Sequence, residues 1–191
     1  MHRIFLIAVF LTSAFCQVKG PLKEIGENSL NQVKEKILNA RSISIEFKRS
    51  RKLKETGRTF TDTGKIFYTK KPLQFKLVLP DEILILKEKT LYRIVPDFEE
   101  IYIENWDGNN PILSYFSLLK KAKEVKRNVY EIKEDDTVKK IYLDEKGFIR
   151  KITTENPLMI FEIAIEKFSI NGRIKKSEFK IPEMKKVDLR R

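Results

Sequence analysis

The sequence predicts a mainly β fold, a curved antiparallel sheet of about eleven strands that forms an unclosed β-barrel with a helical lid. Three observations predict it. Most of the chain after residue 42 consists of short segments in which apolar and polar residues alternate, as in a strand with one face in water. Proline, glycine or asparagine lies between many of these segments. Helical spacing interrupts the series in only two places.

The first helical segment precedes the sheet. Asn28 or Ser29 is suited to cap a helix, and apolar residues follow at helical spacing, namely Leu30, Val33, Ile37 and Leu38. A strand is predicted from Ser42 onward. The further predicted strands span residues 59–69, 73–79, 82–87, 90–95, 99–104, 128–133, 137–144, 148–153, 158–168 and 173–181. Asn171 and Gly172 both tolerate positive φ, so they predict a two-residue hairpin turn before the last strand.

The second helical segment is the predicted lid. Asn110 is placed to cap a helix, and Pro111 to occupy its first position. Apolar residues then recur at helical spacing: Ile112, Phe116, Leu119 and Ala122. The lysine-rich stretch that ends at Lys126 suits the C-terminal end of a helix, where cations interact favourably with the helix dipole.

The N-terminus predicts export. A short cationic start is followed by an apolar run over residues 4–15, which is shorter than the roughly 20 residues of a membrane-spanning helix and has signal-peptide length. We predict a signal peptide at residues 1–16 and a single domain at residues 17–191. Lipidation of Cys16 is the alternative, although a lipoprotein signal has a small residue where this chain has Phe15.

The charge of the chain is strongly basic. The net charge of +12 is compatible with nucleic-acid binding. However, the lysines are interleaved with glutamates along nearly every segment, and the protein is predicted to be exported. We therefore predict a solvated charged surface and no nucleic-acid partner. Attraction to anionic membrane surfaces is a secondary expectation.

Catalytic and metal-binding chemistry is not predicted. The only histidine, His2, and the only cysteine, Cys16, belong to the predicted signal peptide. The domain then lacks the residues of Ser-His-Asp and Cys-His catalysis and of His/Cys zinc sites. The acidic clusters, which include Asp97 and Glu100, fall at predicted turns, where aspartates usually bond their own backbone. The sequence thus predicts no enzyme, metal or cofactor, and an enzyme that uses these acids is a remote alternative.

Several segments, taken in order, resemble the periplasmic outer-membrane lipoprotein carriers, the LolA family. Residues 64–76, GKIFYTKKPLQFK, resemble the family's glycine at a strand start, its basic residue and proline in a turn, and the aromatic residue that follows. Further segments are similar to its later strands, its covering helix and its closing strand: residues 79–85, 89–92, 108–113, 179–182 and 187–188. The resemblance covers nearly the whole of the predicted domain.

The resemblance implies a monomeric carrier in the periplasm. It would take acylated lipoproteins from an inner-membrane ABC-type releasing transporter, hold their acyl chains in an apolar cavity, and pass them to an outer-membrane acceptor. The ligand-binding residues expected on this basis are Phe47, Phe67, Lys71, Phe75, Leu77, Ile85, Leu113 and Phe116. Lys71 stands where the family has an arginine, and lysine lacks the forked donors of arginine. A contact from Lys71 to the lid is therefore expected to be weaker or differently built.

Two other functions fit the same predicted shape. One is a lipid- or lipoprotein-sensing interaction module that transports nothing. The other is a membrane-anchored lipoprotein acceptor, which requires lipidation of Cys16. Composition alone does not separate these alternatives from a carrier.

Overall fold

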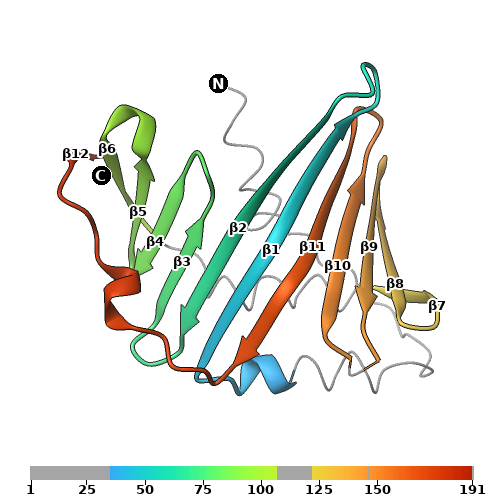
Figure 1. The fold of residues 1–191 in the computed structure, drawn as a ribbon, viewed down its shortest axis with the longest axis horizontal. Helices are drawn as coiled ribbons and strands as arrows, with labels where there is room; N and C mark the ends of the chain where they lie inside the picture. The colour runs from blue at the N-terminus through green and yellow to red at the C-terminus, as the bar shows by residue number, and fades with distance from the viewer. Residues whose placement is uncertain (1–34, 107–121, 146, 191) are drawn as a thin grey trace.

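The computed structural model describes residues 35–106, 122–145 and 147–190. Twelve strands of this part of the chain form one sheet in the order β12-β6-β5-β4-β3-β2-β1-β11-β10-β9-β8-β7 (Figure 1). The strands are β1 (Ser42–Leu53), β2 (Thr59–Thr69), β3 (Gln74–Val78), β4 (Ile83–Lys87), β5 (Thr90–Val95), β6 (Glu100–Asn105), β7 (Lys123–Lys126), β8 (Val129–Glu134), β9 (Thr137–Leu143), β10 (Ile149–Glu155), β11 (Met159–Ile170) and β12 (Lys185–Asp188). Short 3₁₀ segments occur at η1 (Pro96–Phe98) and η2 (Lys176–Phe179).

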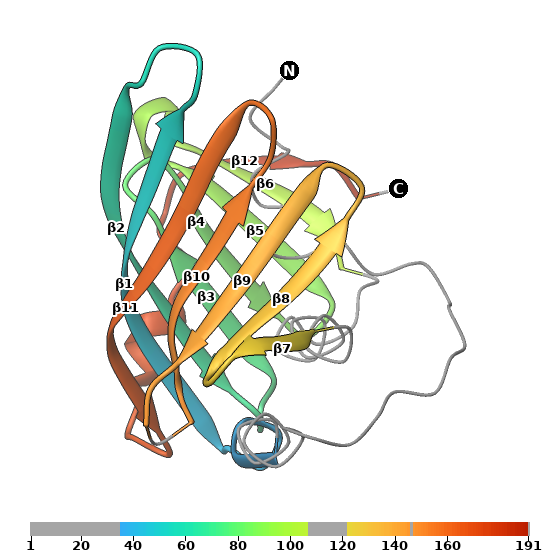
Figure 2. The same ribbon diagram turned by 90° about the vertical axis from the view of Figure 1, so that its right-hand side faces the viewer.

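The sheet consists of two meanders joined along their longest strands. β1 pairs antiparallel with β2 on one side and with β11 on the other. β1 is followed in the chain by the first meander, and β11 belongs to the second. Their pairing joins the two meanders into one continuous sheet. Figure 2 shows how this sheet curls, with β7 and β12 at its two free edges. The predicted fold class, a curved and unclosed antiparallel sheet, is confirmed.

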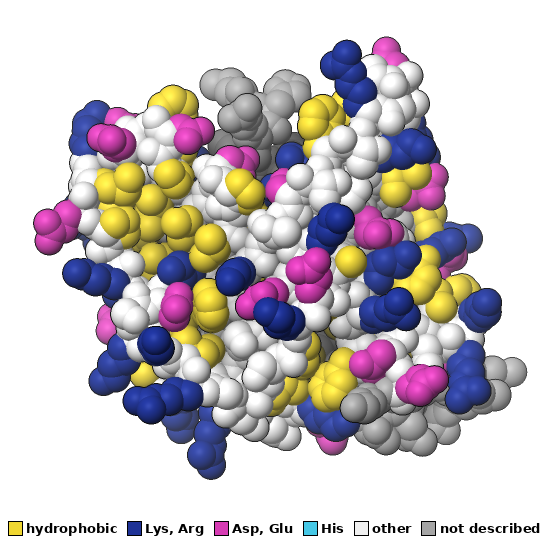
Figure 3. Space-filling model, viewed as in Figure 1, with side chains coloured by type: hydrophobic (Ala, Val, Ile, Leu, Met, Phe, Trp, Pro, Cys, Tyr) yellow, Lys and Arg dark blue, Asp and Glu magenta, His cyan; other side chains and the backbone are white. Residues whose placement is uncertain are grey.

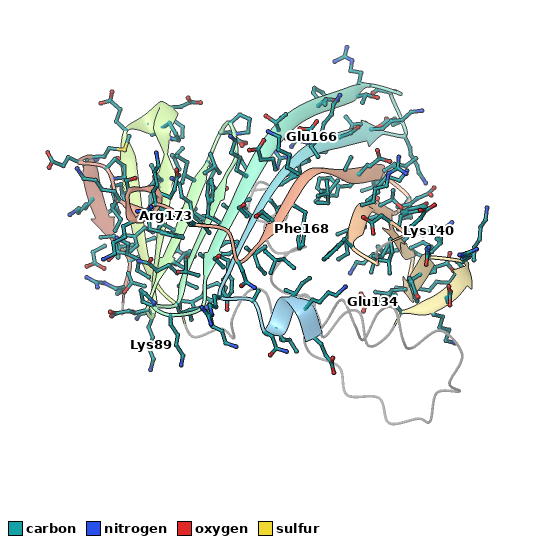
Figure 4. All side chains as sticks on the ribbon, turned by 60° about the horizontal axis from the view of Figure 1, so that its bottom comes forward. Lys89, Glu134, Lys140, Glu166, Phe168 and Arg173 are labelled. Atoms are coloured by element: carbon teal, nitrogen blue, oxygen red, sulfur yellow. The ribbon has the colours of Figure 1, made fainter. Side chains whose placement is uncertain are left out.

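Successive side chains point to opposite faces of the sheet, and both faces carry apolar clusters. The concave side, called the inner face below, carries a cluster that joins Tyr68 of β2 with Tyr130 of β8 and Ile37 of the helical turn at residues 35–38. Strands β1, β11, β10 and β9 lie between β2 and β8 in the sheet, so only curvature toward this side brings the two tyrosines into one cluster. Figure 4 brings the bottom of Figure 1 forward and shows the sheet curving around the inner-face side chains, among them Phe168 of β11.

The opposite side, called the outer face, is covered over β3 to β6 by the segment that follows β11. A second cluster lies there, built from Ile85, Ile94, Ile101 and Ile103, with Ile181 and Met184 packed against it. Phe179 of η2 is buried, and the ammonium of Lys76 in β3 lies 3.7 Å from the carboxylate of Glu178. The C-terminal segment then ends as β12, which pairs parallel with β6.

Two predictions for this end of the chain are wrong. Residues 173–181 do not form a strand, because their apolar side chains are used to cover the outer face. Asn171 does have a positive φ of 59°, but the chain leaves the sheet at this point instead of forming a hairpin. The Asn171 side chain accepts a hydrogen bond from the backbone N–H of Arg41, and the Ser42 hydroxyl donates to the carbonyl of Gly172.

The predicted helices fall mostly outside the described residues. Of the first, residues 35–38 are helical as predicted. Of the second, the part up to residue 121 lies outside the description, and its predicted lysine-rich end is wrong. Residues Lys123–Lys126 form β7, which pairs with β8 across a turn that contains Asn128 at a φ of 60°. The predicted signal peptide also lies outside the described residues.

Candidate functional site

The candidate site is a continuous apolar surface on the inner face of β1 to β4 and β11. Adjacent strands supply its side chains in register, since Phe75 lies opposite Leu86, and Leu77 lies between Ile66 and Leu84. The full cluster is Phe47, Ile66, Phe75, Leu77, Leu79, Leu84, Leu86, Phe161 and Ile163, each at most 9% exposed. Such a surface holds apolar groups by the hydrophobic effect alone, at about 25 cal/mol per Å² of apolar area.

A glycine makes room for the largest side chain of this surface. Phe47 of β1 lies directly opposite Gly64 of β2, and its ring lies against the glycine backbone. A Cβ atom at position 64 would stand 2.3 Å from Cζ of Phe47, far inside van der Waals contact. The glycine that the sequence placed within this strand therefore sets the position of the Phe47 ring.

Three of the eight predicted ligand-binding residues come together on this surface, namely Phe47, Phe75 and Leu77. Phe67 and Ile85 lie on the other face, because each immediately follows an inner-face residue along its strand. Phe67 is half-buried there, and Ile85 is buried in the outer-face cluster under the C-terminal segment. Leu113 and Phe116 lie outside the described residues. The structure leaves the ligand-binding role of all eight as a prediction.

Lys71 is the last of the eight predicted residues, the one expected to contact the lid. It is exposed in the turn between β2 and β3. Its neighbour Lys70 contacts the helical turn instead. The ammonium of Lys70 donates to the backbone carbonyl of Leu38 at 2.9 Å, which ties the sheet to the short helical turn. Sequence reasoning missed this residue, because the pattern at the turn does not distinguish two consecutive lysines.

Charged side chains border the apolar surface on the side of the turn that connects β1 and β2. Arg49 is 6% exposed and binds Asp62 in bidentate fashion, with Nε–Oδ1 and Nη2–Oδ2 distances of 2.7 and 2.6 Å. Arg51, one inner-face position further along β1, reaches the same carboxylate at 3.3 Å. Two guanidinium groups thus share a single half-buried carboxylate, and no pattern in the sequence predicts this arrangement.

A second charged group borders the surface from β5, β6 and the turn before β4. Arg93 lies 3.9 Å from Glu82 and 3.5 Å from Glu104, and its guanidinium stacks on the ring of Tyr102. Burial raises the pKa of Glu82, and the nearby carboxylates of Asp81 and Glu104 raise it further; the cations Arg93 and Arg49 act in the opposite direction. The ionised form of Glu82 is therefore disfavoured by folding.

This shift predicts a pH-dependent effect of Glu82→Gln. A carboxyl whose pKa is higher in the folded state than in the unfolded state favours folding while it is protonated, and this contribution is lost as the pH rises through the raised pKa. The variant lacks that loss, so its stability relative to the wild type should increase from mildly acidic to neutral pH. Urea unfolding at several pH values measures the difference, and a difference that does not change with pH would contradict the assignment.

Glu100, one of the acidic residues considered for catalysis, has structural partners. The carboxylate of Glu100 accepts hydrogen bonds from the Lys185 ammonium at 2.6 Å and the Tyr102 hydroxyl at 2.7 Å. Both bonds lower the pKa of Glu100, and the bond from Lys185 joins β12 to β6. Asp97 lies in η1, at the turn between β5 and β6.

Neither a metal site nor a membrane-spanning helix is found in the part of the chain that the structure describes. No group of three or more His, Cys, Asp or Glu side chains within it is arranged to hold a metal ion. No described helix has the length and apolar character needed to cross a membrane.

A hollow of about 660 Å³ opens beside the helical turn, lined by Glu35, Lys36, Asn39, Ile170 and Asn171.

Comparison with known proteins gives a likeness of fold. No protein-family model and no curated protein sequence matches the chain. Among solved structures, an uncharacterized conserved protein from Thermus thermophilus has a TM-score of 0.56 and 6% identity, over 85% of this chain and 98% of that one. A DUF1329 family protein from Desulfovibrio piger has a TM-score of 0.49 and 11% identity, over 81% and 95% of the two chains. A LolA superfamily protein from Nitrosomonas europaea has a TM-score of 0.44 and 8% identity, over 83% and 99%. The chain shares its fold with the Thermus thermophilus protein.

Proposed function

We propose that the protein is a periplasmic carrier that binds the acyl chains of lipoproteins on its inner face. The observation that carries this proposal is the continuous apolar surface of Phe47, Phe75, Leu77 and their neighbours on the concave side of an open sheet. The ordered sequence resemblance to the periplasmic lipoprotein carriers supports the choice of cargo. An acyl chain is long, flexible and apolar, and it matches a surface that offers contact area without directed hydrogen bonds.

Binding would exchange one apolar contact for another. The inner-face side chains are shielded from water in the structure, so acyl chains that reach them replace apolar contacts that already exist. Each methylene removed from water contributes about 0.8 kcal/mol. This balance keeps binding reversible, because release requires only an acceptor with a larger apolar surface. No bond is made or broken, in keeping with the prediction that the protein is not an enzyme.

The partners of such a carrier are a donor and an acceptor. We propose that acylated lipoproteins reach it from an inner-membrane ABC-type transporter and leave it for an outer-membrane acceptor. A sensing module of the same shape would bind the acyl chains and release them to no acceptor. The two functions differ in transfer and not in the binding site.

Displacement of a fluorescent apolar probe tests the binding claim. The purified protein is titrated with the probe and then with a triacylated lipopeptide, or with its deacylated twin as the control. We expect displacement by the acylated peptide alone. Equal displacement by both peptides, or no probe binding by the folded protein, would contradict acyl-chain binding. Transfer of the bound lipopeptide to acceptor vesicles then separates the carrier from the sensing module.

A further inference from the structure

One end of the sheet is formed by two neighbouring tips, the turn of the β1–β2 hairpin and the turn between β10 and β11. The backbone N–H of Lys54 donates to the carbonyl of Leu158 at 3.0 Å, and Leu53 pairs with Met159 across β1 and β11. Both tips project at the same end of the molecule, at the top right of Figure 1. We call residues 51–60 and 155–159 together the β1–β2 tip.

The β1–β2 tip exposes large apolar side chains. Leu158 is 74% exposed and Phe60 is 49% exposed, and the Leu53–Met159 pair between the two strands is half-buried. A single exposed apolar side chain is common on a protein surface. Here two large ones flank a half-buried pair at a projecting tip, where they are available to a partner but pack against little of the protein itself.

Cations surround these apolar side chains. The β1–β2 tip contains the basic residues Arg51, Lys52, Lys54 and Arg58 and the acidic residues Glu55 and Glu155. Lys54 and Glu155 form an ion pair at 2.7 Å, which leaves an excess of positive charge. Figure 3 shows lysine and arginine side chains at this end of the molecule.

Arg51 has binding capacity that the described protein does not use. It lies on the inner face between Phe60 of β2 and Phe161 of β11. Its only described acceptor is Asp62, at 3.3 Å, and that carboxylate is already held by both donors of Arg49. The Nε–H of Arg51 is buried and donates to no acceptor within the described residues. The Arg51 side chain as a whole is 32% exposed, so its remaining donors can meet an anionic oxygen from outside, and phosphate fits the forked donors of a guanidinium.

We propose that the β1–β2 tip is a docking surface for an anionic phospholipid membrane, with Arg51 as the contact to a headgroup phosphate. Phe60 and Leu158 would enter the boundary between headgroups and acyl chains, and the lysines would lie among the headgroups. Arg51 lies directly opposite Phe60 in the register of β1 and β2, so entry of the Phe60 ring into this boundary brings the guanidinium to the level of the headgroups. The net charge of +12 draws the whole protein toward such a surface.

Sedimentation with sucrose-loaded vesicles tests the proposal. The purified protein is mixed with vesicles of phosphatidylcholine alone or of phosphatidylcholine with phosphatidylglycerol, and it should bind the anionic vesicles more tightly. The double variant Phe60→Ser/Leu158→Ser should lower the partition coefficient at least about tenfold, because two large apolar side chains no longer enter the membrane. Arg51→Gln should lower it about fivefold on anionic vesicles. The effect should be smaller on phosphatidylcholine alone, because the choline cation beside each phosphate competes with the guanidinium.

The matched control carries the same kind of change elsewhere. Val125→Ser/Leu189→Ser replaces two other exposed apolar residues, 55% and 50% exposed, away from the tip, and it should bind vesicles as the wild type does. Unfolding midpoints check that all variants are folded. The proposal is overturned if the Phe60→Ser/Leu158→Ser variant binds like the control, or if Arg51→Gln binds anionic vesicles as tightly as the wild type does. Probe displacement by the lipopeptide in solution should survive Phe60→Ser/Leu158→Ser, so loss of docking is distinguishable from loss of acyl-chain binding.

Discussion

Phe75→Ser should weaken acyl-chain binding at least about tenfold, whereas Phe67→Ser should leave it unchanged. Phe75 belongs to the inner-face surface, and loss of a buried phenylalanine side chain removes roughly 1.5–3 kcal/mol of apolar contact. Phe67 is the same residue type on the neighbouring strand but on the outer face, in register with Lys76. The displacement of an apolar probe by a triacylated lipopeptide, measured for both variants, gives the two affinities.

The stability of both variants has to be measured alongside, because Phe75 is a core residue. A large-to-small change in a core costs about 3–5 kcal/mol for phenylalanine, and an unfolded variant would bind nothing. Leu77→Thr provides a milder change on the same inner-face surface and should weaken binding in the same direction. Equal affinities of folded Phe75 and Phe67 variants would remove the inner face from the binding site.

Arg49→Met should destabilise the protein by about 3 kcal/mol, the low end of the range for a broken buried pair. The change leaves the half-buried Asp62 with only the longer contact to Arg51. The double variant Arg49→Met/Asp62→Leu should recover most of this loss, because the half-buried carboxylate is then removed together with its closest cation. Arg51 also loses a contact to Asp62, but its side chain is 32% exposed and keeps contact with water. Urea unfolding of the wild type, the two single variants and the double variant gives the coupling between the two residues.

An exposed pair between the same kinds of groups is the control for that cycle. Lys54 and Glu155 lie 2.7 Å apart, but Glu155 is 54% exposed, and exposed pairs contribute little to stability. Lys54→Met should therefore change the stability far less than Arg49→Met. If the two variants were equally destabilised, burial of the Arg49–Asp62 pair would not be the cause of the effect.

The strands could be predicted closely because alternation is a local property. The predicted ranges 59–69 and 90–95 coincide with β2 and β5. The parallel pairing of β12 with β6 could not be predicted, since a four-residue strand carries almost no pattern and its partner is distant in sequence. The segment at residues 173–181 alternates like a strand, yet its apolar residues cover the outer face, a choice that only the finished sheet determines.

The composition of the site could be predicted only in part, for a related reason. Phe67 and Ile85 each lie in a run of consecutive apolar residues, Ile66 to Tyr68 in β2 and Ile83 to Leu86 in β4. Where both faces of a strand are buried, alternation no longer shows which residue belongs to which face. The Arg49–Asp62 pair depends on the register of β1 and β2, which the sequence pattern leaves open.

The most direct test of the central claim is to locate a bound acyl chain relative to the two faces of the sheet. A lipopeptide with a spin label on its acyl chain broadens the NMR signals of nearby methyl groups. In β4, Leu84 and Leu86 belong to the inner-face surface, while Ile85 between them belongs to the outer-face cluster. We predict stronger broadening of the Leu84 and Leu86 methyl signals than of the Ile85 signal. Broadening that is equal on both faces, or stronger at Ile85, would contradict binding on the inner face.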